Sequence, residues 1–182
     1  MKSASNPNAQ KKERKLLPVI DLKCFGCGSE NPHGLRMRFE TDGSRLYSRL
    51  SIAEHLRGWS NLAHGGVISS ILDEVMSWTA ICLSERLILT KKMEVEFLRP
   101  VLIKEEIFAE GWSDEIIDGR TAIISAHITD AKGNVLARAK GNFALLKKSS
   151  FERLGITVEN LPNSIETLLE IVANLKNMDE DK

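Results

Sequence analysis

Two adjacent carboxylates, Asp73 and Glu74, interrupt the most apolar stretch of the sequence. This stretch spans residues 61–82 and reads NLAHGGVISSILDEVMSWTAIC, with apolar side chains at helical spacing on most sides. We therefore predict a helix at about residues 65–83 that the rest of the domain encloses. Because an unpaired charge is costly to remove from water, each carboxylate must be held by a partner or take part in chemistry.

The predicted helix begins with His64, Gly65 and Gly66. The first N–H groups of a helix have no partner within it, and the helix dipole makes this end positive. Glycines there allow close approach, so the N–H of Gly65 is suited to hold a carbonyl oxygen that gains negative charge. A buried carboxylate such as Asp73 is suited to act on the same carbonyl group as a base or a nucleophile.

The spacing of Gly65 and Asp73 decides how such a site is assembled. Eight helical positions span about 12 Å, whereas reacting atoms must come within about 3–3.5 Å of each other. One helix therefore cannot offer both groups to one carbonyl. Two antiparallel copies related by a twofold axis can, so this chemistry requires a homodimer with two composite sites.

Each of these residues also has a purely structural interpretation. His64 can serve only as a helix cap, and Asp73 can bond to the backbone or to serines of its own helix. Glu74 is expected to pair with a basic side chain such as Arg57 or Lys91. The combination of glycines at the start, an enclosed helix and one carboxylate in a row of small residues favours a functional site.

Composition narrows the function classes. The chain has 25 lysines and arginines and 25 aspartates and glutamates, so no strong field attracts nucleic acid. We find no apolar run of the roughly 18 residues typical of a membrane span. The polar, lysine-rich N-terminus has no apolar segment of signal-peptide type. We expect a cytoplasmic protein that binds neither nucleic acid nor membrane.

The three cysteines are Cys24, Cys27 and Cys82, a count that argues against a disulfide framework. Cys24 and Cys27 have the spacing of half a zinc site, but a tetrahedral site needs four ligands and no second pair is visible. His33 is the nearest histidine in the sequence. We therefore favour a structural loop and expect no metal and no cofactor.

Alternating apolar and polar residues predict strands on both sides of the helix. Two strands, beginning at Leu35 and at Leu46, are joined by a turn at Asp42-Gly43. Four more follow the helix, one of them at residues 106–117 with Gly111 as a possible bulge. This order favours an α+β fold in which a curled antiparallel sheet wraps around one long central helix. We assign residues 1–17 to a disordered tail, 18–148 to this domain and 149–182 to a C-terminal helical extension.

Several segments are together similar to one protein family. They are CFGCGSENPHGLRMRF, HGGVISSILDE, VEFLRPV and VLARA. On these motifs, residues 24–146 resemble the hotdog-fold thioesterases of the PaaI-like (phenylacetic acid degradation) group. The resemblance implies a hotdog fold, a homodimer that often pairs into a homotetramer, and metal-independent hydrolysis of acyl-CoA thioesters to free acid and coenzyme A.

The resemblance also implies roles for individual residues. Gly65 polarises the carbonyl through its N–H, and His64 shapes the site beside it. Asp73 is the base or nucleophile and acts from the opposite subunit. Thr90 matches a hydroxyl position that helps to place the attacking water.

The candidates for substrate binding are Gly66, Asn61, Trp59 and Arg99. Relatives often have an asparagine six positions before the histidine, where this chain has Gly58, and Asn61 is the nearest replacement. Arg99 suits either the phosphates of coenzyme A or a structural salt bridge. The residue type of Trp59 favours core packing over stacking on a ligand.

Two other functions are compatible with the sequence. One is a non-catalytic acyl-CoA-binding hotdog protein, which ligand-dependent stabilisation without hydrolysis would favour. The other is a hotdog dehydratase or hydratase that acts on an acyl thioester, although the motif typical of those enzymes is not visible.

Overall fold

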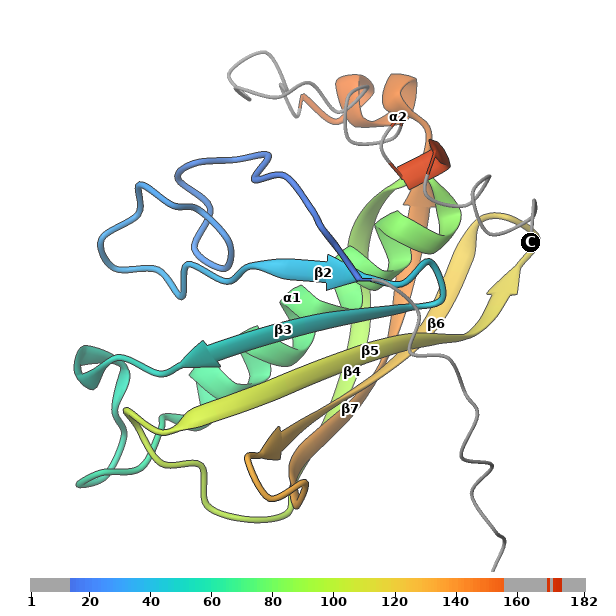
Figure 1. The fold of residues 1–182 in the computed structure, drawn as a ribbon. Coiled ribbons are helices and arrows are strands. Elements are labelled where there is room, and N and C mark those ends of the chain that lie inside the picture. The colour runs from blue at the N-terminus through green and yellow to red at the C-terminus, as the bar shows by residue number, and fades with distance from the viewer. Residues whose placement is uncertain (1–13, 156–169, 171, 175–182) are drawn as a thin grey trace, which may run out of the picture.

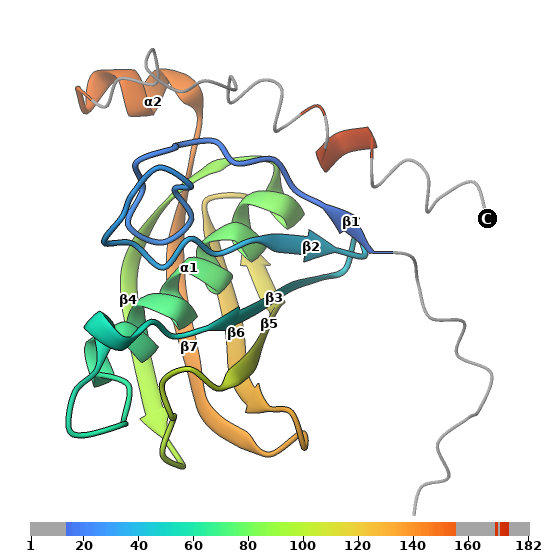
Figure 2. The same ribbon diagram turned by 60° about the vertical axis from the view of Figure 1, so that its left-hand side comes forward.

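The computed structural model describes residues 14–155, 170 and 172–174. One antiparallel sheet wraps around a single long helix, α1 (Gly65–Ser84) (Figure 1, Figure 2). The strands are β1 (Lys15–Leu16), β2 (Phe39–Thr41), β3 (Arg45–Ser51), β4 (Leu87–Phe97), β5 (Glu106–Ile117), β6 (Thr121–Asp130) and β7 (Val135–Leu146), in the order β1-β2-β3-β5-β6-β7-β4. A short 3-10 helix (Glu54–Leu56) precedes α1, and α2 (Lys148–Arg153) follows β7. The predicted α+β arrangement of a curled sheet around a central helix is confirmed.

The apolar side chains of α1 make it the centre of the core. Ile71, Leu72, Val75 and Met76 are fully buried. The helix ends where Glu85 adopts a left-handed backbone conformation (φ 54°) and donates its N–H to the carbonyl of Ile81. The predicted helix is confirmed and runs one residue further than expected.

By length and composition alone α1 qualifies as a membrane span, which the sequence interpretation did not anticipate. However, 61% of its most apolar window is buried inside the structure. The core helix of a hydrophobic domain meets the same criteria, so its place inside the sheet accounts for its apolar character.

Gly111 lets α1 approach β5 closely. A Cβ atom at this position would overlap Thr79 Oγ1 and lie 2.9 Å from Val75 Cγ1. The predicted bulge at Gly111 is wrong, because the register of β5 on β6 shifts between Ser113 and Glu115 instead. The glycine serves the packing of helix on sheet.

The strand predicted from Leu35 begins only at Phe39. Residues before it pair with the cysteine-containing loop, since Leu35 donates its N–H to Phe25 and Met37 donates its N–H to Gly26. A left-handed backbone at Arg36 (φ 52°) separates these two bonds. The turn at residues 42–43 and the returning strand are confirmed.

The prediction that residues 1–17 form a disordered tail is wrong for the last residues of this range. Lys15 and Leu16 form β1 on the edge of β2, and Leu17 is buried in the core. Leu16 and Leu17 are consecutive, and successive side chains of an extended chain point to opposite sides. One of the two therefore faces the core, and its burial holds this segment against the domain. The rest of the predicted tail and most of the predicted C-terminal extension lie outside the described residues.

We expect Gly111→Ala to lower the free energy of unfolding by about 1–3 kcal/mol, because the added methyl group overpacks a filled core. Chemical denaturation measures this cost. Thr79→Ala removes the atom that the methyl group would strike, so Gly111→Ala should cost less in that background. An equal cost in both backgrounds would contradict the packing explanation.

Candidate active site

Asp73 lies midway along α1 and faces β4. Thr90 Oγ1 on β4 donates a hydrogen bond of 2.9 Å to Asp73 Oδ1. Burial raises the pKa of Asp73 above its usual value, and the bond from Thr90 opposes this shift. The carboxylate is thus half-buried, fixed in position and still reachable, as a base or nucleophile must be.

A β-bulge explains how Thr90 comes to face α1. The register of β4 on β7 shifts between Thr90 and Lys92, which leaves Lys91 as the extra residue. Met93, after the bulge, packs against the core. Side chains alternate along a strand, so without the extra residue Thr90 and Met93 would point to opposite faces.

The start of α1 is capped by His64. The N–H of Gly66 donates a hydrogen bond of 3.0 Å to His64 Nδ1, so this N–H is already engaged. The N–H of Gly65 has no acceptor within the part of the chain that the structure describes. Both glycines are exposed. Of the two predicted glycine positions, Gly65 is therefore the one that offers a free donor to a ligand.

The two halves of the candidate site lie along the same edge strand. Thr90 meets Asp73 near the start of β4, whereas a Cβ atom on Gly65 would lie 3.8 Å from the ring of Phe97 at its end. Among the described strands, β4 pairs only with β7, which leaves its other edge open (Figure 2). Phe97 remains 55% exposed beside this edge.

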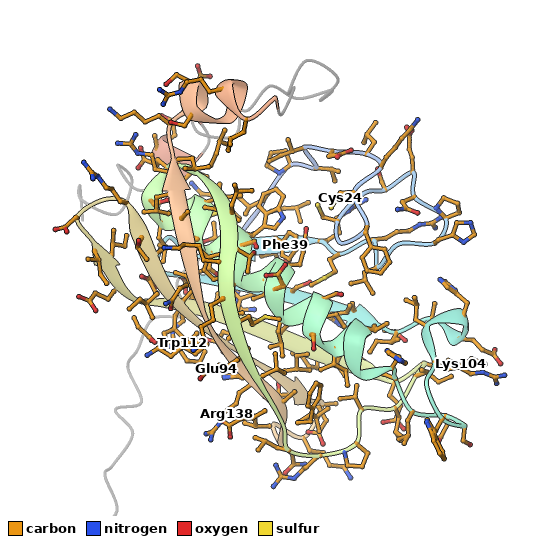
Figure 3. All side chains as sticks on the ribbon, turned by 180° about the vertical axis from the view of Figure 1, so that it is seen from behind. Cys24, Phe39, Glu94, Lys104, Trp112 and Arg138 are labelled. Carbon is orange, nitrogen blue, oxygen red and sulfur yellow. The ribbon has the colours of Figure 1, made fainter. Side chains whose placement is uncertain are left out.

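Two surface hollows, of about 380 and 500 Å³, lie elsewhere. Side chains on the outer face of the sheet line them, including Tyr47 and Phe108 in the first and Trp112 and Arg138 in the second (Figure 3). Neither is lined by the candidate catalytic residues. These two hollows therefore do not mark the candidate site.

The remaining predicted substrate-binding residues are exposed. Trp59 is 87% exposed, so the expectation of core packing is wrong. Asn61 accepts the N–H of Ile103 through its backbone carbonyl, and its side chain is open to solvent. Arg99 donates a hydrogen bond of 2.6 Å to the carbonyl of Val135 and forms no salt bridge within the described residues.

Glu74 does not pair with Arg57 or Lys91, and that prediction is wrong. Trp78 Nε1 donates a hydrogen bond of 3.2 Å to Glu74 Oε1, and Cys24 Sγ lies 3.8 Å from the same oxygen. Burial raises the pKa of Glu74 to about 7, with a further contribution from negative charge at Cys24. No pattern in the sequence indicates that Glu74 meets the cysteine-containing loop.

Comparisons with known proteins address the fold and the family resemblance. Residues 60–137 match the model of the Thioesterase superfamily. The match covers less than half of the chain, and it agrees with the predicted resemblance to hotdog-fold thioesterases. No curated protein matches the sequence.

Solved structures share the fold at low sequence identity. AziG of S. sahachiroi is 20% identical with a TM-score of 0.57, over 62% of this chain and 93% of that chain. E. coli PaaI, from the phenylacetic acid degradation operon, is 14% identical with a TM-score of 0.56, over 62% and 81%. A hypothetical thioesterase of Streptococcus pneumoniae TIGR4, solved with coenzyme A, is 15% identical with a TM-score of 0.53, over 56% and 81%. These likenesses show the fold.

We expect Thr90→Val to raise the pKa of Asp73. The hydroxyl stabilises the charged carboxylate, and its loss leaves the effect of burial unopposed. A carbon-detected NMR titration of the carboxyl groups measures this pKa directly. Thr90→Ser keeps the hydroxyl and should leave the pKa near its original value. An unchanged pKa in the valine variant would show that the hydrogen bond does not form in solution.

Proposed function

We propose that the protein is an acyl-CoA thioesterase, which hydrolyses an acyl-CoA thioester to a free acid and coenzyme A. The observation that carries this proposal is the half-buried Asp73 carboxylate held by Thr90 in a thioesterase-superfamily domain. The structure of a relative in fold with coenzyme A supports this ligand class.

Gly65 and Asp73 divide the chemistry between them. The N–H of Gly65 holds the thioester oxygen and stabilises its negative charge as the carbonyl is attacked. Asp73 takes the proton of an attacking water, or itself attacks to form an anhydride that water then hydrolyses. In both routes the carbon–sulfur bond breaks, the thiolate of coenzyme A takes up a proton and the acyl group leaves as the acid.

The open edge of β4 is the surface on which the dimer required by this mechanism can form. Consider a second copy whose β4 runs antiparallel beside the first, with a twofold axis near the middle of the strand. The Thr90 end of each strand then lies next to the Phe97 end of the other. Asp73 of one copy thereby approaches the start of α1 in the other copy, where Gly65 offers its N–H. The exposed Phe97 side chains are covered by the same pairing.

Asp73→Asn should lower kcat by at least about 100-fold, because the amide can neither accept the proton nor attack the carbonyl. Thiol release from a panel of short, long and aromatic acyl-CoA substrates measures this loss and identifies the preferred acyl group. Asp118→Asn, in the exposed β5–β6 turn, is the matched control and should remain active.

Gly65→Pro is a companion variant in the same assay. Proline is favoured at the first position of a helix, where it removes the N–H without breaking the helix. His64 already has the extended backbone (φ −67°, ψ 138°) that a residue before proline requires. Gly65→Ala retains the N–H and serves as its control.

If Asp73→Asn is as active as the wild type, Asp73 is structural. If acyl-CoA stabilises the protein without any thiol release, the domain is a binding protein.

A further inference from the structure

Three potential metal ligands meet on the side of α1 that is covered by the N-terminal loop. They are the thiols of Cys24 and Cys27 and the carboxylate of Glu74, and one donor atom from each lies within 4.8 Å of the others. Figure 3 shows Cys24 in this loop, beside the helix. The cluster is separate from the Asp73–Thr90 pair, which faces β4.

The loop holds Cys24 in the manner of a metal-binding turn. The backbone N–H groups of Gly26 and Cys27 point at Cys24 Sγ, at 3.3 and 3.5 Å. The carbonyl of Cys24 in turn accepts the N–H of Gly28 at 3.0 Å. N–H donors of this kind stabilise a thiolate, which is the form of cysteine that binds metal.

Gly26 shows that the loop is built around the Glu74 carboxylate. A Cβ atom at Gly26 would overlap both the carboxyl carbon and Oε2 of Glu74. Only a glycine lets the backbone come this close. Gly26 also accepts the N–H of Met37, so the loop is fixed to the chain that leads into β2 as well as to the helix.

Within the described part of the chain, no ion pair with a basic side chain balances the charges of this cluster. The hydrogen-bond partners of the Glu74 carboxylate among the described residues are Cys24 and Trp78, and neither is a basic side chain. The nearby guanidinium of Arg38 donates instead to the backbone carbonyl of Cys27, at 3.1 Å. Three groups that can carry negative charge are therefore gathered, partly or fully buried, without an ion-pair partner among residues 14–155, 170 and 172–174.

We propose that Cys24, Cys27 and Glu74 bind a zinc ion, with a water molecule as the fourth ligand. Two thiolates and one carboxylate are an appropriate donor set for Zn²⁺, whereas Mg²⁺ and Ca²⁺ prefer oxygen ligands alone. At zinc bond lengths, two donors of a tetrahedral site lie about 3.5–3.8 Å apart. The 3.8 Å separation of Cys24 Sγ and Glu74 Oε1 already matches this spacing. The ion would join the loop to the central helix and neutralise the cluster.

The full chain, freed of metal with a chelator under reducing conditions, is titrated with Co²⁺ and then with Zn²⁺. We expect one Co²⁺ per chain, a thiolate-to-cobalt charge-transfer absorption, and displacement of Co²⁺ by Zn²⁺ with a rise in melting temperature. Cys24→Ala and Glu74→Gln should each weaken Zn²⁺ binding by at least about 10-fold. Glu74→Gln is close to isosteric and removes a buried charge, so it preserves the fold.

Cys82→Ala is the matched control, because Cys82 is also buried on α1 but lies outside the cluster. It should leave Zn²⁺ affinity unchanged. Folded, reduced wild type that shows no charge-transfer band overturns the proposal, and so does a band that persists in Cys24→Ala. A Cys24–Cys27 disulfide in protein freshly isolated from a reducing cytoplasm also overturns it, because the pair would then be a redox couple. These readouts do not depend on thioester hydrolysis.

Discussion

The enclosure of α1 by the sheet is the constraint on which the rest of the structure depends. A helix with Ile71, Leu72, Val75 and Met76 fully buried leaves little surface on which a charge can be solvated. The cost of an unpaired buried charge then requires a partner for every acidic group on the helix. Gly111 permits the close approach of helix and sheet that makes the enclosure complete.

The adjacent carboxylates of Asp73 and Glu74 find their partners on different sides of α1. Neighbouring residues on a helix point about 100° apart, so Asp73 reaches β4 while Glu74 reaches the loop before β2. Asp73 keeps one hydroxyl partner and access to solvent, which suits a reactive group. Glu74 lies beside one indole N–H and two thiols, and this environment suits a ligand of a metal ion. One helix thus positions both proposed sites, which differ in chemistry.

The sequence predicted the helix and the curled sheet well, because long periodic patterns are local signals, and it singled out Asp73, a half-buried carboxylate on that helix. It did not predict that Glu74 faces Cys24, since a contact between residues so distant in sequence leaves no periodic trace. The bulge at Lys91 was also invisible, and Thr90 entered the site only through family resemblance. The pairing of Lys15 and Leu16 with β2 was missed because a two-residue strand is too short to show alternation.

The central claim is that each active site uses Gly65 from one copy and Asp73 from the other. Mixing Gly65→Pro protein with Asp73→Asn protein, after reversible dissociation, tests it most directly. Each mixed dimer then holds one site with neither substitution, and random exchange should restore about a quarter of the wild-type thioesterase activity. Activity that stays at the level of the separate variants, although mass spectrometry shows that mixed dimers have formed, would contradict the composite site.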